Sequence, residues 1–279
     1  MTSNTFNPVY IGNNRVLIKT KRDIFLRVDS NDALVSQSLI TKGEWDPVLE
    51  KLYDKILFPG ANYMEIGCHI GYFSVLACCL VGIDGFCVLF EPNPRSMDLL
   101  KANLRANILT HICDINELAI SDVDGEVEFI QFSTNSGSSS LGMPGERLIR
   151  DYAEVPVIKK CNATTLDGYC ISKNMIYDFV KIDAEGAEAK IFNGGSNFFK
   201  SSLNNRSVVI CEFNPPMLNS VGGDANYIIN GLCCGGREIY TYSEKGIEKR
   251  VSKLSDLDQR NISELIALSP VRKKEIFGE

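Results

Sequence analysis

Residues 62–74 read Asn62-Tyr63-Met64-Glu65-Ile66-Gly67-Cys68-His69-Ile70-Gly71-Tyr72-Phe73-Ser74, and this stretch decides the fold. Its first part is a short run that heads into the core and reaches the acidic residue Glu65, and glycines follow at 67 and 71. An apolar helical stretch then runs from Phe73 to about Val81. A strand, a tight glycine turn and a helix form the opening unit of a nucleotide-binding type of α/β fold. We expect Gly67 to keep the backbone open to a ligand and Gly71 to let the helix pack closely on the sheet.

A second buried strand, Phe86-Cys87-Val88-Leu89-Phe90, leads directly into Glu91. Ligands of open parallel sheets lie at the carboxyl ends of the strands, where the strand order reverses. A carboxylate at that place can accept hydrogen bonds from both hydroxyls of a ribose. The sequence therefore predicts a nucleoside site.

The spacing of the glycines indicates which nucleoside binds. A dinucleotide-binding turn has three glycines in the order G-x-G-x-x-G, whereas this chain has Glu65, Gly67 and Gly71, with His69 between the glycines. The imidazole of His69 would crowd a pyrophosphate, and Glu65 would repel one. The cationic tail of S-adenosylmethionine, with its ammonium and sulfonium groups, fits this turn better.

The rest of the chain predicts a Rossmann-like α/β fold, with a mostly parallel seven-stranded sheet and helices on both faces. Residues 1–58 are expected to form a β-hairpin and a helix that begins at Asp46-Pro47. Residues 59–279 are expected to form the Rossmann-like domain. Within it, residues 133–160 begin with a polar, glycine-rich stretch, which we interpret as a substrate loop or lid.

Residues 112–120 are predicted to form the third strand of this sheet. Its tip carries Asn116 and Glu117, where such folds meet an adenine ring, although an ordinary surface strand is an equally good interpretation. The fourth strand ends at Asp183 and the fifth at Glu212. Both acids are expected at the ligand edge of the sheet.

Composition limits the function classes. The net charge is −6 and the pI is about 5.2, so a nucleic-acid backbone is not the expected partner. Ten cysteines without C-x-x-C spacing favour reduced core residues over a metal or disulfide site. The longest apolar run, Phe73 to Ile83, is too short to cross a bilayer. No leader sequence is visible after Met1, and we expect a cytoplasmic protein without membrane insertion, with a homo-oligomer as an open alternative to a monomer.

Several motifs together resemble the FkbM-type methyltransferases. The resemblance covers about Gly43 to Leu268, and its clearest part is Asp178-Phe179-Val180-Lys181-Ile182-Asp183-Ala184-Glu185-Gly186-Ala187-Glu188. Further matching pieces are Phe90-Glu91-Pro92-Asn93-Pro94, Asn135-Ser136-Gly137-Ser138-Ser139-Ser140-Leu141 and Thr165-Leu166-Asp167. The resemblance implies a class I fold, S-adenosylmethionine as cofactor, and O-methylation of a hydroxyl on a sugar, glycan or glycosylated natural product. The family usually has Asn where this chain has His69, and His where it has Asn214.

These considerations predict three groups of site residues. The catalytic candidates are Asp183, as the carboxylate that accepts the hydroxyl proton, and His69, which alternatively contacts the donor or is structural. The predicted cofactor-binding residues are Glu65, Gly67, His69, Gly71, Glu91, Asn93, Asn116, Glu117 and Asp183. The predicted substrate-binding residues are Glu185, Glu212, Asn214, Ser138 and Ser139. No metal site is predicted, with Mg²⁺ at Asp183, Glu185 and Glu212 as the alternative.

Two rival functions remain at this stage. One is an NAD-dependent nucleotide-sugar oxidoreductase or epimerase, which the absent third glycine disfavours. The other is a catalytically degenerate methyltransferase fold that acts as a binding module, which the acids at four strand tips disfavour (Glu65, Glu91, Asp183 and Glu212).

Overall fold

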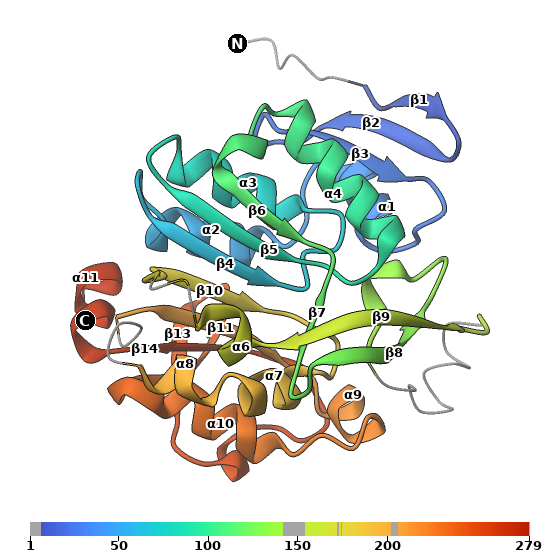
Figure 1. Cartoon of the computed structure of the whole chain (residues 1–279). Coiled ribbons are helices and arrows are strands. Elements are labelled where there is room, and N and C mark those ends of the chain that lie inside the picture. The colour runs from blue at the N-terminus through green and yellow to red at the C-terminus, as the bar shows by residue number, and fades with distance from the viewer. Residues whose placement is uncertain (1–6, 142–153, 172, 174, 202–205, 279) are drawn as a thin grey trace.

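The computed structural model describes residues 7–141, 154–171, 173, 175–201 and 206–278. It contains one large central sheet with helices on both faces and two small three-stranded sheets (Figure 1). The fold is therefore α/β, as the sequence predicts.

The central sheet has eight strands in the order β13-β12-β14-β11-β10-β4-β5-β6. Five neighbouring strands are parallel, from β11 to β6, and β14, β12 and β13 are added in antiparallel pairings. The strands are β4 (Asn62–Ile66), β5 (Phe86–Phe90), β6 (Cys113–Asn116), β10 (Phe179–Ile182), β11 (Val208–Phe213), β12 (Glu238–Ser243), β13 (Gly246–Val251) and β14 (Ser263–Leu268).

The sheet is therefore mixed, with five adjacent parallel strands, and it has eight strands and not the seven that the sequence predicts. The unpredicted strand β13 pairs with β12 across a tight turn between Ser243 and Gly246, whose φ is +94°. Its exposed Glu248, Lys249 and Arg250 suit an edge strand but hide the alternation that would reveal it. Strand β14 then lies between β12 and β11 and pairs antiparallel with both. A parallel pairing usually needs a long crossover connection, and the segment that leads into β14 does not form one.

Each face of the central sheet has its own apolar core, because side chains alternate along a strand. One core joins Tyr63 and Phe179 to the helices of the N-terminal half. The other joins Met64 and Val180 to helices of the C-terminal half. The first group of helices is α1 (Val35–Lys42), α2 (Pro47–Ile56), α3 (Tyr72–Val81) and α4 (Pro94–Ala106), and the second includes α7 (Glu188–Gly194), α8 (Ser196–Lys200) and α10 (Ala225–Cys233). The remaining helices are α6 (Leu166–Cys170), α9 (Pro215–Ser220) and α11 (Pro270–Phe277).

The expected third strand over residues 112–120 is divided between two sheets. Strand β6 ends at Asn116, and β7 (Ala119–Ser121) pairs with β9 (Val157–Thr165) in a small sheet completed by β8 (Gly125–Gln131). The end of α7 packs against β7 so closely that a Cβ at Gly194 would lie 2.1 Å from the Ser121 carbonyl oxygen. At β7 the chain has left the edge of the central sheet. In this segment Leu118, and not Asn116, lines the cavity at the ends of the central strands that is described below.

The N-terminal extension contains the predicted hairpin and one further strand. Strands β2 (Arg15–Lys19) and β3 (Phe25–Asp29) pair antiparallel, and β1 (Val9–Gly12) adds to β2. Asp46 caps α2, and Pro47 is its first residue, as predicted. Residues 142–153 of the predicted 133–160 insertion lie outside the described residues, while 157–160 belong to β9.

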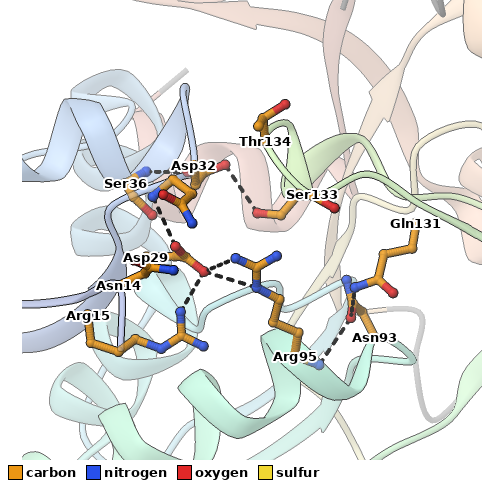
Figure 2. Close-up of polar contacts among 12 residues, drawn as sticks. Asn14, Arg15, Asp29, Asp32, Ser36, Asn93, Arg95, Gln131, Ser133 and Thr134 are labelled. Atoms are coloured by element: carbon orange, nitrogen blue, oxygen red, sulfur yellow. Dashed lines mark hydrogen bonds and ion pairs between the residues drawn. The ribbon is translucent and has the colours of Figure 1, made fainter. Parts of the chain in front are cut away.

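Asp29 joins this extension to the central domain. Its buried carboxylate accepts hydrogen bonds from Arg15 on β2 and from Arg95 in the first turn of α4, with 3.0 Å between Arg95 Nε and Asp29 Oδ2 (Figure 2). Burial alone would raise the pKa of Asp29, but the Asn31 N–H and the two guanidinium groups lower it below its ordinary value.

Replacement of Asp29 by Asn is expected to lower the free energy of unfolding by about 1–3 kcal/mol, because two partly buried guanidinium groups lose their counter-ion. The lowered pKa means that this stabilisation is present above the ordinary value of 3.8 and disappears as the pH falls through the lower folded-state pKa. Urea denaturation of wild type and D29N at several pH values measures the difference. Asp23→Asn is the control, since Asp23 pairs with Lys19 at the surface. Equal effects of the two substitutions would contradict the assignment.

Two further features bear on the sequence predictions. No helix in the described part of the chain is long and apolar enough to cross a membrane. All ten cysteines are free thiols.

Candidate functional site

The turn after β4 brings the ends of two central strands into direct contact. Gly67 has φ +91°, and a Cβ there would lie 1.8 Å from the carbonyl oxygen of Asp183. The predicted need for glycine is therefore correct, but the neighbour that excludes a side chain is the chain itself at the end of β10. Gly71, with φ +83°, similarly approaches Leu100 on α4, and not the sheet as predicted.

A cavity of about 220 Å³ lies beside this turn, at the carboxyl ends of the parallel strands. A single water needs roughly 10–15 Å³, so the space suits a much larger ligand. Its walls come from the N-terminal extension, the turn, the strand ends and the 133–141 segment, and include Val35, Trp45, Glu65, Gly67, His69, Phe73, Glu91, Leu118, Phe129, Ser136, Ser139, Lys181, Asp183, Glu185, Glu212 and Glu264.

Glu91 is held at the cavity by main-chain groups. Its Oε2 accepts from the N–H of His69 at 2.7 Å, and its Oε1 accepts from the N–H of Asn93 at 2.9 Å. Asn93 caps α4 by accepting from the N–H of Arg95, and its Oδ1 also accepts from Gln131 (Figure 2). Burial raises the pKa of Glu91 to about 7, although the two N–H groups act in the opposite direction. Each carboxylate oxygen keeps a lone pair for a ligand hydroxyl.

Lys181 joins two acids of neighbouring strands. Its Nζ lies 2.7 Å from Asp183 Oδ2 and 3.8 Å from Glu65 Oε1, and it is itself buried. Burial alone would lower the pKa of Lys181, but Asp183 and Glu65 outweigh it and raise that pKa. Glu65 also accepts from the hydroxyl of Ser74, and burial raises the pKa of Glu65 to about 7. The carboxylate of Asp183 is more exposed than Lys181 and lines the cavity, and its ion pair with the buried Lys181 fixes its position.

The opposite end of the cavity is acidic. Glu212 on β11 and Glu264 on β14 are cross-strand partners, and both line the cavity with Glu185. Burial raises the pKa of all three, that of Glu264 to about 7. This wall presents oxygen atoms that accept hydrogen bonds from hydroxyl or amino groups.

His69 connects the turn to two distant segments. Its backbone has φ +50°, and its Nε2 lies 2.7 Å from the hydroxyl oxygen of Ser136. Ser136 in turn donates to Asp32 Oδ1 at 3.1 Å. Burial lowers the pKa of His69, against the effects of Asp32 and Asp183, so the imidazole is neutral near pH 7.

Other predicted site residues lie beside the cavity or away from it. Asn116 donates to Tyr169 and Leu89, and Glu117 pairs with Lys101, so neither side chain lines the cavity. Asn214 caps α9 and donates to Glu212 at 3.0 Å. Ser139 lines the cavity, while the side chain of Ser138 is outside the described atoms.

Four cavity or supporting residues were missed from the sequence: Lys181, Glu264, Asp32 and Ser136. Lys181 left a signal, because a lysine inside a buried apolar strand requires a partner. Ser136 lies in one of the motifs that resemble the family, but its role was not assigned. Glu264 and Asp32 left no signal, since their roles depend on segments far apart in the chain. Within the described residues, no group of three or more His, Cys, Asp or Glu side chains is arranged to hold a metal ion.

A family model and solved structures match this chain. A family model, the methyltransferase FkbM domain, matches residues 65–238. An O-methyltransferase from Bacillus cereus, solved with S-adenosylhomocysteine, is 14% identical with a TM-score of 0.45, and the match covers 81% of this chain and 82% of that one. An S-adenosylmethionine-dependent O-methyltransferase from Thermotoga maritima is 11% identical with a TM-score of 0.44, covering 96% of each chain. A search of curated proteins found no match.

Proposed function

Because this chain belongs to the FkbM family of S-adenosylmethionine-dependent methyltransferases, we propose that it methylates a hydroxyl oxygen of a sugar, glycan or glycosylated natural product. The observation that carries the proposal is the position of Asp183. Its partly exposed carboxylate lines the same cavity as the Gly67 turn and Glu91. A donor site and a proton acceptor therefore share one cavity.

The residues at the turn fit the donor. Glu91 offers a carboxylate oriented by two main-chain N–H groups, which suits the two hydroxyls of a ribose. Glu65 and Asp183 supply negative charge for a cationic amino-acid tail, and Lys181 neutralises only part of it. When bound, S-adenosylmethionine supplies a methyl carbon on a positively charged sulfur, which is already activated for transfer to an oxygen. The enzyme mainly has to align that oxygen.

Asp183 accepts the proton of the acceptor hydroxyl on a carboxylate oxygen. The hydroxyl becomes acidic as its oxygen bonds to the methyl group, so a carboxylate oxygen can accept its proton at that point. Lys181 keeps this carboxylate oriented, because it is itself fixed between two strands. Glu185, Glu212 and Ser139 line the cavity as hydrogen-bond partners for the other hydroxyls of the acceptor.

Calorimetric titration tests the donor, and mass spectrometry tests the acceptor. The protein is titrated with S-adenosylmethionine and with NAD, and only the first is expected to bind. Sugars and glycosylated lipids are then screened for a gain of one methyl group that resists mild ester hydrolysis. Binding of NAD alone would support an oxidoreductase, and binding of neither would support a degenerate module. Either result would overturn the proposal.

Affinity for S-adenosylmethionine is expected to rise between about pH 6 and about pH 8, with release of protons on binding. Glu65 and Glu91 have pKa values of about 7, because both are buried. A cationic ligand favours their ionised forms, so these carboxyl groups lose protons as it binds. Titration in two buffers of different ionisation enthalpy measures the protons released. Glu91→Gln is expected to reduce that number, and uptake of protons by the wild type would contradict the assignment.

A further inference from the structure

A chain of hydrogen bonds links three segments that are far apart in the sequence. It runs from His69 Nε2 to Ser136 Oγ at 2.7 Å and from Ser136 Oγ to Asp32 Oδ1 at 3.1 Å. Asp32 is only 3% exposed, and its other oxygen, Oδ2, accepts from the N–H of Ser36 at 2.6 Å (Figure 2). A main-chain hydrogen bond joins two of the same segments, since the N–H of Ala33 donates to the carbonyl of Thr134 at 2.8 Å. The N-terminal extension is thus bonded to the donor-binding turn through the 133–141 segment.

The direction of each hydrogen bond in this series follows from the carboxylate of Asp32 at its end. An ionised carboxylate can only accept, so the hydroxyl of Ser136 donates to Asp32. The oxygen of Ser136 is then free to accept from Nε2–H of a neutral imidazole. The proton of His69 is therefore on Nε2, and Nδ1 carries the lone pair. Nδ1 has no hydrogen-bond partner in the described part of the chain, and it is not one of the buried polar atoms without a partner, so it is open to the cavity that His69 lines.

We propose that Asp32 and Ser136 are positioning residues that keep the proton of His69 on Nε2, so that Nδ1 accepts a hydrogen bond from the ammonium group of the methyl donor. This inference rests on the proposed function, because it assigns a role to a residue of the donor site. Nδ1 is the ring nitrogen nearer the backbone, and the backbone N–H of His69 holds Glu91, the predicted ribose ligand.

The charged groups around His69 support a neutral ring at this place. Asp32 faces it from the N-terminal extension, Asp183 and Lys181 act on it from β10, and Glu91 binds its main-chain N–H. Burial keeps the pKa of His69 below its ordinary 6.5 despite the acids. An imidazolium would bring a positive charge against the donor's own cation, whereas a neutral ring with an open lone pair attracts its ammonium.

Asp32→Asn tests the directions of these hydrogen bonds without removing them. The Asn oxygen can still accept from Ser36, so the amide NH₂ faces Ser136 and donates to it. Ser136 must then donate to Nε2, and the proton of His69 moves to Nδ1, where it opposes the ammonium. The same change from Asp to Asn places a proton on the wrong nitrogen in the serine-protease triad. Affinity for S-adenosylmethionine is expected to fall on the order of 10- to 100-fold, the effect of losing a hydrogen bond to a charged group.

5′-Methylthioadenosine provides the ligand control, because it keeps the adenosine and lacks the amino-acid tail. Its affinity is expected to be the same for wild type and D32N. Ser136→Ala removes both hydrogen bonds of Ser136 without reversing their direction. It is therefore expected to weaken S-adenosylmethionine binding less than D32N does. In a His69→Asn background the amide oxygen accepts without any tautomer, so adding D32N is expected to change nothing further.

Nitrogen-15 NMR reads the tautomer directly and needs no activity. The chain has two histidines, so His111→Asn leaves one imidazole in the spectrum. The wild-type ring is expected to be protonated on Nε2 and the D32N ring on Nδ1. The inference is overturned if both share one tautomer, or if D32N weakens the two ligands equally. A wild type that binds methylthioadenosine and S-adenosylmethionine equally would also overturn it, whereas binding of neither would overturn the proposed function itself.

Discussion

Gly67→Ala is expected to lower the free energy of unfolding by about 3–5 kcal/mol and to abolish donor binding. Two costs add at this position. A residue with a side chain is strained at φ +91°, and its Cβ would lie 1.8 Å from the Asp183 carbonyl oxygen. That oxygen belongs to the backbone, so it can withdraw only if β4 and β10 separate. Such a separation also displaces the two strand ends that form the cavity wall.

Gly82→Ala is the matched control for Gly67→Ala. Gly82 also has a positive φ, +65°, but a Cβ there would meet nothing within 4 Å. It therefore carries the backbone strain alone, about 1–3 kcal/mol. Urea denaturation gives the stability of both variants, and calorimetry gives their affinity for S-adenosylmethionine. Equal destabilisation by the two substitutions would show that the contact between the strand ends costs nothing.

Asp183→Asn is expected to lower the turnover number about 10²–10⁴-fold and to weaken donor binding far less, because Glu65 still supplies negative charge to the donor. The amide keeps the shape of the side chain and an oxygen for Lys181, whose Nζ lies 2.7 Å from Asp183 in the wild type. It cannot accept a proton, so the reaction slows at the step in which the hydroxyl proton leaves. Single-turnover kinetics on the identified acceptor, together with donor calorimetry, separates the two effects.

Glu185→Gln is the comparison for Asp183→Asn. Glu185 lines the same cavity two residues later, and we assign it to binding of the acceptor and not to proton transfer. Its substitution is expected to raise KM more than it lowers kcat. Turnover near the wild-type value in Asp183→Asn, with the loss found instead in Glu185→Gln, would exchange their roles.

The strand–turn–helix unit and its place at a ligand edge were predictable because local chemistry encodes them. Gly67 and Gly71 both have positive φ, and Asp46, Asn93 and Thr165 cap the helices that follow them. Glu91 lies at the cavity, because a strand that ends in an acid delivers it to the carboxyl edge of a parallel sheet. Such features depend on residues close together in the chain.

The wrong predictions and the residues that were missed concern contacts between distant segments. Strand β14 inserts between β11 and β12, and the chain leaves the central sheet after Asn116 to pair with β9. Which strands become neighbours depends on the packing of whole elements, so no local pattern announces it. The same is true of the ion pair between Lys181 and Glu65, which are 116 positions apart but adjacent in the sheet register.

The sequence by itself determined the α/β class, the glycine turn, the acids at the strand ends and the resemblance to one methyltransferase family. Each of these depends on backbone conformations and side-chain types that a short segment specifies alone. Only the tertiary structure decided which atom Gly67 must avoid, which acid Lys181 links to Asp183, and which side chains meet the imidazole of His69. These are contacts between segments that lie far apart in the chain, and such segments meet only when the whole core has packed.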